Sequence, residues 1–197
     1  MLGELGALKG PVWMALSITV ISSASMFTIF TYIAPLLNDV TGVTPRGVTY
    51  TLFLIGLGMT LGNVIGGKLS DWRLNATLIG VFLATAVMLG LLAVVARDVL
   101  LTELALFFWA GISFAGCNAL QIKAVNLGRN APNLISTLNI GAFNGGNALG
   151  AWVGGQVIGH QLGLTAIPPA AAILTIIALA LTLLSLPRRH RLLQPAT

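Results

Sequence analysis

The side chains of this chain that could do chemistry are mostly amides and hydroxyls set within long apolar stretches. At about 100° per helical residue, Glu103, Phe107, Phe114, Asn118 and Gln121 fall on one narrow face. Such a face alternates hydrogen-bonding groups with aromatic rings. It suits a cavity for an amphipathic organic molecule.

Three other stretches carry a comparable stripe by the same helical rule. The stripes are Ser17, Ser25, Thr28 and Tyr32; Thr49, Phe53, Gly56, Thr60, Asn63 and Gly67; and Asn139, Phe143, Gly146, Asn147, Gly150 and Gly154. For any single Asn, a hydrogen bond between helices, worth ~0.6–2 kcal/mol, is the better interpretation. The joint pattern favours a shared cavity. Its predicted lining is Ser25, Tyr32, Asn63, Phe107, Phe114, Asn118, Gln121, Asn139, Phe143 and Asn147.

The elements that carry these stripes are six apolar segments that hold almost none of the ten basic and five acidic residues. A charge at the centre of a bilayer costs several kcal/mol, about 2.5–3.5 on insertion scales, so this exclusion indicates a multi-pass membrane protein. Each segment is near or above the ~20 residues that a helix needs to cross ~30 Å of hydrocarbon. We predict an all-α membrane protein with a single six-helix bundle over residues 1–197. The predicted spans are Val12–Ala34, Val48–Leu69, Ala76–Ala96, Leu100–Ile122, Asn133–Gly159 and Pro168–Leu186.

The basic residues predict the orientation. Taken alternately, the gaps on one side contain Arg46 and Arg97, and those on the other contain Lys9, Lys68, Arg73, Lys123, Arg129, Arg188, Arg189 and Arg191. By the positive-inside rule, both termini are expected in the cytoplasm. The pI of about 10.2 then reflects topology, and we expect no nucleic-acid partner. We expect the basic tail after Pro187 to anchor at the membrane surface.

Polar residues are unevenly shared among the spans. Asn, Gln and Glu are absent from Ala76–Ala96 and Pro168–Leu186. Polar groups in membranes normally face a bundle interior, so these two spans are expected against lipid and the other four around the interior. This membership repeats every three helices, as in a 3+3 inverted repeat.

Glycine spacing predicts close contacts between helices. Gly58, Gly62 and Gly66 lie four residues apart on the side opposite Asn63, and small-xxx-small spacing lets backbones approach. Gly146, Gly150 and Gly154 are predicted to pack in the same way. Gly141, Gly145, Gly155 and Gly159 occupy the back of that stripe.

Few residues could support a reaction. Glu103 is the one acid placed inside a span, and a carboxyl there could couple proton entry to solute exit. Cys117 has no neighbouring Cys or His, and both histidines lie in gaps, so we expect no metal site, no cofactor and no enzymatic activity.

The run Ala142–Gly155 resembles the eleventh helix of a branch of the major facilitator superfamily, the arabinose-efflux-permease-like and chloramphenicol-resistance-like drug:H⁺ antiporters. Phe30–Leu36 is similar to its seventh helix and Gly56–Asp71 to its eighth helix and following loop. The resemblance covers essentially the whole chain. It implies helices seven to twelve, the C-terminal half of a twelve-helix carrier.

The family carries Gly-x-x-x-Asp-Arg-x-Gly-Arg-Arg after the second helix of each half. Here Gly67 and Asp71 match, whereas Trp72, Leu74 and Asn75 depart from it. The resemblance implies a cytoplasmic gate role for Gly67 and Asp71 only. Capping of a helix is an equally good interpretation of Asp71.

The resemblance implies an inner-membrane efflux carrier that works by rocking of two halves and is coupled to protons. One half alone supplies six helices, so the expected protein partner is the missing N-terminal half or a second copy. The other expected partners are the lipid bilayer, protons and a small neutral or amphipathic solute such as a drug, sugar or nucleoside. The alternatives are a channel-like bundle and a non-transporting membrane scaffold; an intramembrane protease ranks far below them.

Overall fold

The computed structural model describes residues 10–129 and 131–186, and between these limits the regular elements are all helical. The long helices are α2 (Gly10–Phe30), α4 (Pro45–Val95), α5 (Val99–Leu127), α6 (Pro132–Gly159) and α7 (Ile167–Leu184). Three short elements join them: α3 (Ile33–Pro35), the π-helix η1 (Leu36–Thr41) and the 3₁₀ turn η2 (Leu164–Ala166). The predicted all-α class is confirmed.

The first predicted span is longer than expected and is broken once. Helix α2 ends at Phe30, a turn follows, and α3 and η1 continue the path to Thr41. Pro35 explains the break, because it has no amide proton to donate to the carbonyl of Thr31 one turn earlier. The π-helical stretch then closes at Gly42, whose φ of 77° is readily available only to glycine.

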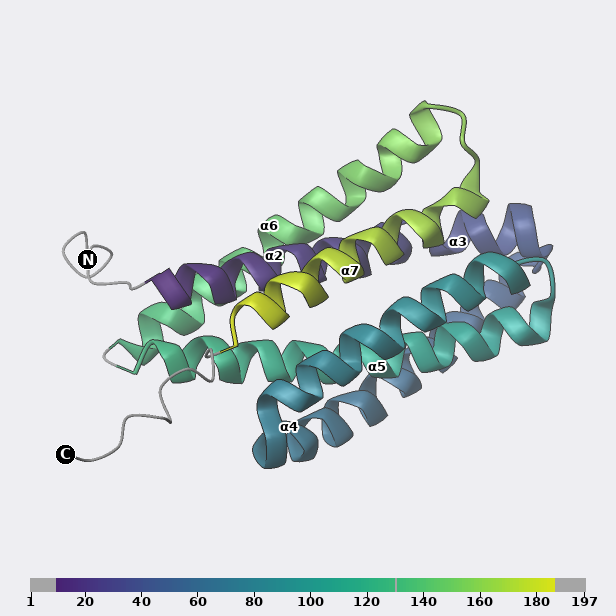
Figure 1. The fold of residues 1–197 in the computed structure, drawn as a ribbon. Coiled ribbons are helices and arrows are strands. Elements are labelled where there is room, and N and C mark those ends of the chain that lie inside the picture. Colours follow the sequence, from purple (N-terminus) through teal and green to yellow (C-terminus); the bar gives the residue numbers. More distant parts are fainter. Residues whose placement is uncertain (1–9, 130, 187–197) are drawn as a thin grey trace, which may run out of the picture.

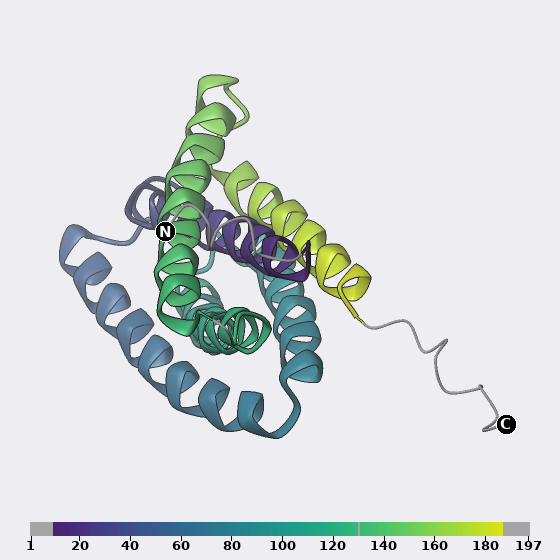
Figure 2. The same ribbon diagram turned by 90° about the vertical axis from the view of Figure 1, so that its left-hand side faces the viewer.

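The second and third predicted spans are joined in the single element α4. The predicted gap between them is helical except at Arg73, where φ is −147° and ψ is 76°. This residue bends α4 into two arms that diverge around α5 (Figure 2). The Thr77 hydroxyl donates to the carbonyls of Leu69 (2.8 Å) and Arg73 (3.0 Å), which ties the two arms together at the bend.

Helix ends follow local sequence signals. The Thr44 hydroxyl accepts from the Gly47 amide at the start of α4, and an Asp98 carboxylate oxygen accepts from the Leu101 amide (2.8 Å) at the start of α5. Helix α6 begins at Pro132, and α7 has prolines in its first turn, where no amide proton is needed.

The bundle packs in two groups of helices (Figure 1). Both arms of α4 enclose α5, while α2 lies against α6 and α7, and α7 joins the groups through α4. The main core contains Ile29, Leu36, Leu89, Leu106 and Trp109.

Within the described part of the chain, four segments are long and apolar enough to cross a membrane: Gly10–Thr41, Pro45–Val95, Val99–Leu127 and Leu164–Leu184. Pro45–Val95 contains two predicted spans. Helix α6 is long enough, at ~1.5 Å for each of its 28 residues, but its amides and glycines lower its hydropathy. Six crossings therefore stay a prediction.

The second arm of α4 and helix α7 present apolar outer surfaces. From Gly80 to Val95 and from Ile167 to Leu184, every exposed residue is apolar, whereas Thr85, Thr175 and Thr182 are buried. These are the two predicted spans without amides, and their outer surfaces suit contact with lipid.

Candidate functional site

The first arm of α4 has two contrasting faces. Gly58, Gly62 and Gly66 face α5, and a Cβ at Gly62 would overlap the backbone of Gly111. The other side is exposed although it belongs to an apolar helix, with Phe53 66% accessible. This exposed stripe is Thr49, Phe53, Gly56, Thr60 and Asn63.

An amide pair borders the exposed stripe. The Asn118 side chain of α5 donates to the backbone carbonyl of Asn63 (2.9 Å) and to its side-chain oxygen. Phe114, one turn before Asn118, is half-buried. Asn63 and Asn118 therefore bond to each other beside the open side, with Phe114 one helical turn away on α5, and a shared cavity lined by these residues stays a prediction.

A second amide group lies inside the bundle. Asn139 is 0% exposed, and its side-chain oxygen accepts from the Thr19 hydroxyl (2.8 Å) while its amide nitrogen donates to Gln121 (2.6 Å). Gln121 in turn donates to Ser136 (2.8 Å). This network joins α2, α5 and α6. Asn139 therefore serves helix packing and does not line an open cavity.

The hydroxyls of α2 also bond to neighbouring helices. Ser25 is buried and donates to the Ala171 carbonyl of α7 (2.8 Å), and the Tyr32 hydroxyl donates to the Ala151 carbonyl of α6 (3.0 Å). The Ser23 hydroxyl contacts Asn147 and the Phe143 carbonyl. The predicted role of Ser25 in lining the solute cavity is wrong for this structure. In membrane proteins such hydroxyls commonly form hydrogen bonds to a neighbouring helix, as Ser25 does here.

Helix α6 packs through the glycines that the sequence singled out. A Cβ at Gly146, Gly150 or Gly154 would overlap Val20, Ala24 or Tyr32 of the first span, respectively. Phe143 is half-buried on the same side.

Most of the back of α6 is open instead of packed, although a Cβ at Gly155 would lie 3.3 Å from the Tyr32 hydroxyl oxygen. Gly141, Gly145 and Gly159 have nothing within 4 Å of a Cβ position, and Trp152 is 60% exposed. Sequence reasoning noted these glycines but did not recognise an unpaired face. The available signal is the four-residue spacing of Gly141 and Gly145 and of Asn144 and Ala148, which puts small or polar residues on one side of the helix.

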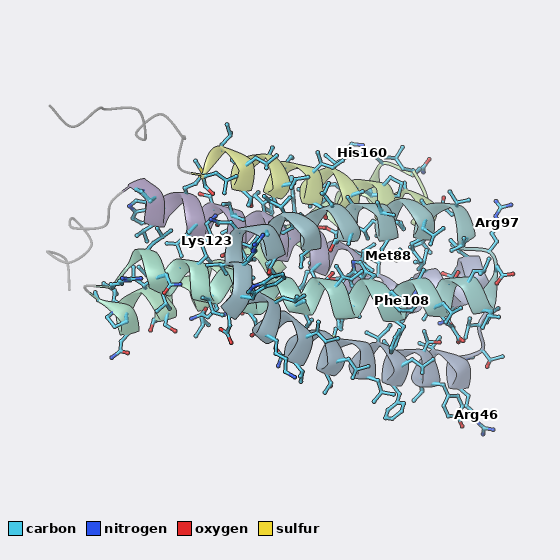
Figure 3. The ribbon with its side chains drawn as sticks, turned by 60° about the horizontal axis from the view of Figure 1, so that its bottom comes forward. Arg46, Met88, Arg97, Phe108, Lys123 and His160 are labelled. Atoms are coloured by element: carbon cyan, nitrogen blue, oxygen red, sulfur yellow. The ribbon has the colours of Figure 1, made fainter. Side chains whose placement is uncertain are left out.

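Phe107 lies elsewhere than predicted. With Phe108 (ring centroids 5.3 Å apart) it lines an apolar groove of about 630 Å³ between the two arms of α4 and α5. Figure 3 shows Phe108 partway along α5. The groove opens away from the Asn63 stripe, because Leu61 and Ile65, which line it, occupy another side of the first arm.

Glu103 is half-buried near the start of α5, where its carboxylate accepts from the Thr51 hydroxyl (2.8 Å). The gate candidates lie at the other end of the first arm of α4. Gly67 has no atom within 4 Å of a Cβ position, and Asp71 is exposed and bonds to no described side chain.

Lys123 is deeper than the sequence indicated. The sequence pattern predicts this residue in a gap, yet it lies within α5, is 7% exposed, and donates to the Ser185 hydroxyl (2.7 Å). Arg46 and Arg97 lie at one end of the bundle and Lys123 lies toward the other (Figure 3).

An all-helical bundle of apolar helices, joined internally by amide and hydroxyl bonds, defines the class of multi-pass membrane proteins. The chain is 42% identical over 183 residues to the inner membrane transport protein YdhP of Escherichia coli K12, covering 92% of this chain and 47% of that protein. It is 30% identical to an MFS-type transporter, YfhI of Bacillus subtilis, over 80% of this chain and 40% of the relative. It is also 31% identical to the chloramphenicol resistance protein of Streptomyces lividans, over 81% of this chain and 41% of the relative.

The chain belongs to the major facilitator superfamily of transporters. It spans about half the length of the curated relatives it matches. A scan against family models gives no match.

Proposed function

We propose that this chain forms one six-helix half of a secondary active efflux carrier and moves solutes by alternating access. The observation that carries the proposal is the two-faced first arm of α4. Its glycine face packs on α5, while its polar and aromatic face is exposed. Because polar groups are unfavourable against lipid, that face is expected to meet solute, water or another helix bundle.

The solutes we propose are small and neutral or amphipathic. Among the relatives are a probable sugar efflux transporter of Pasteurella multocida, 30% identical over 179 residues, and the chloramphenicol resistance protein. Asn63, Asn118 and Phe114 offer amides beside an aromatic ring, which can bind such molecules without an ion pair. Transport of this kind needs no covalent step, so we assign no enzymatic activity.

The partner we propose is a second six-helix half, either the N-terminal half of a longer chain or another copy of this one. The exposed stripe of α4 and the open glycine face of α6 supply surfaces for it. In this arrangement both termini lie in the cytoplasm and the bundle spans the inner membrane. At the cytoplasmic end, Asp71 then pairs with a helix N-terminus of the partner when the inward side is closed.

Transport can be tested in everted membrane vesicles that contain the chain together with a complementing half. We expect uptake of labelled chloramphenicol or a labelled monosaccharide when a pH gradient is imposed. Asn118→Ala should lower uptake roughly 2–10-fold, the range for one lost hydrogen bond. Ile176→Ala, on the exposed apolar surface of α7, serves as the control. Unchanged uptake in Asn118→Ala would contradict the proposed cavity.

Proton coupling is assigned to Glu103, whose carboxylate accepts from Thr51 and is half-buried. Glu103→Gln keeps an acceptor for Thr51 but cannot exchange a proton near neutral pH. We expect loss of uptake driven by a pH gradient, with solute exchange across the membrane retained. Asp39→Asn, at an exposed site, is the matched control. Gradient-driven uptake by Glu103→Gln would place coupling elsewhere.

A non-transporting scaffold is the second candidate, favoured by the network of Thr19, Asn139 and Gln121, which only joins helices. A scaffold would insert and fold with its complementing half but give no solute flux above that of empty vesicles.

A further inference from the structure

A cavity of about 440 Å³ lies where four helices meet at the Lys123 end of the bundle. Its wall includes Gly10 at the start of α2, Asn75 of α4, Lys123 and Asn126 of α5, and Ser185 just after α7. Neither Glu103 nor any residue of the exposed α4 stripe lines it. It is therefore separate from the proposed solute path.

Lys123 brings a nearly buried positive charge to this cavity. Its ammonium donates to Ser185 (2.7 Å), and Ser185 donates onward to the Thr182 carbonyl (2.7 Å). An ammonium has three protons to donate, and among the described residues only the neutral Ser185 accepts one. Burying a charge without an opposite charge is costly, so this position favours an anion.

The rest of the wall also favours an anion. Asn75 and Asn126 add side-chain amides, and none of the described residues that line the cavity is Asp or Glu. Met14, Leu127 and Leu184 provide apolar wall beside these groups.

The position of the cavity indicates the source of the anion. Lys123 lies toward the end of the bundle opposite Arg46 and Arg97 (Figure 3). At a membrane surface this end meets lipid head groups, and basic pockets between membrane helices on the cytoplasmic side bind anionic head groups. We propose that this cavity is a phosphate-binding site filled by the head group of an anionic phospholipid, whose acyl chains follow the apolar wall.

The site can be tested with the purified full chain in nanodiscs, by measuring which lipids stay bound after exchange into neutral detergent. We expect retention of phosphatidylglycerol over phosphatidylcholine. Lys123→Gln should reduce that preference roughly tenfold or more, since hydrogen bonds to charged groups are the strong ones. Lys68→Gln removes a charge from an exposed site and should change it less than about twofold. If Lys123→Gln does not fold, Lys123→Arg is measured in its place. It keeps the charge and should retain the preference for phosphatidylglycerol.

Equal retention by Lys123→Gln and the unsubstituted chain would overturn the proposal. Displacement of lipid by millimolar inorganic phosphate, with no preference among lipids, would support a phosphate site but overturn a lipid as its source. Glu4 lies outside the described residues. If Glu4→Gln and Lys123→Gln destabilise the protein equally and neither alters lipid retention, the anion is the chain's own carboxylate. Lipid retention is read without transport, so this result is independent of the proposed carrier function.

Discussion

Individual polar side chains in this protein divide into those that bond across helix contacts and those that stay accessible. Asn139 belongs to the first group and Asn63 to the second, although both are asparagines on amide-bearing stripes. The difference arises from which neighbour each residue meets. Thr19 and Gln121 surround Asn139, whereas Asn63 bonds to Asn118 at an open edge.

Gly62 is the residue at which helix contact leaves least room. A Cβ there would overlap the backbone of Gly111, whereas Gly56, on the exposed face of the same arm, has nothing within 4 Å. We expect Gly62→Ala to destabilise the bundle by about 1–3 kcal/mol, as overpacking does. Gly56→Ala should be neutral or slightly stabilising. Thermal unfolding in detergent measures both, and equal midpoints would contradict the packing described.

Thr85 and Ser113 have buried hydroxyls without a partner among the described residues, and both line an internal cavity of about 10 Å³. Thr85→Val keeps the shape and removes an unpaired polar group, so it should be neutral or stabilising. Thr175→Val, which breaks a bond to Ser25 (2.7 Å), should cost about 1 kcal/mol. The unfolding midpoint of Thr175→Val should therefore lie below that of Thr85→Val, and a larger loss for Thr85→Val would refute this.

A single helix in this bundle can have one face packed inside the bundle and another face open to a helix from outside it. Helix α6 shows this best, because Gly150 packs against α2 while Gly145, on another face, has open space around it. One face is needed to fold the half, and the other is free for a helix from outside it.

The two faces of α6 can be separated by matched substitutions. Gly150→Leu should disrupt the bundle itself, because a Cβ there already overlaps Ala24. Gly145→Leu should leave the isolated bundle as stable as before but block its association with a complementing half. Co-purification of the two halves, with unfolding midpoints measured in parallel, checks this. Association that survives Gly145→Leu would place the partner on another face.

At the scale of helices, much of the fold could be predicted from sequence. Apolar length and charge exclusion locate the helices, and glycine spacing identifies the side of α4 that meets α5. The sequence could not predict that the gap between the second and third spans is helical on both sides of Arg73. This geometry depends on the hydrogen bond from Thr77 back to the Leu69 carbonyl.

The candidate site was less predictable. Helical periodicity gives the direction of Ser25 or Phe107 around its own helix, but not which neighbour occupies that direction. Ser25 meets α7 and Phe107 meets the groove between the arms of α4. The depth of Lys123 was missed for a similar reason, since α5 continues past Ile122 and α7 ends beside it.

For the whole molecule, the two sides differ in the number of basic residues that the sequence assigns to them, two on one and eight on the other. Arg46 and Arg97 lie at one end and Lys123 lies toward the other (Figure 3). Because the sequence assigns eight of its ten basic residues to the Lys123 side, we expect that side in the cytoplasm by the positive-inside rule.

The orientation can be measured with alkaline phosphatase fusions, which are active only outside the cytoplasm. We expect activity for fusions after Arg97 and after His160, and none after Arg129. Fusions of green fluorescent protein, which folds in the cytoplasm, should give the reverse pattern. Phosphatase activity after Arg129 would invert the proposed topology.

The broken first span has a mechanical consequence. Beyond the interruption at Thr31–Tyr32, the outer piece ends at Thr41, whose hydroxyl is bonded to the Ala96 carbonyl (2.7 Å) at the far end of α4. Before the interruption, α2 is hydrogen-bonded to α6 through Thr28 and to α7 through Ser25. We therefore expect a displacement of α3 and η1 to be shared with the C-terminal end of α4, and the break at Thr31–Tyr32 to let α2 keep its own direction.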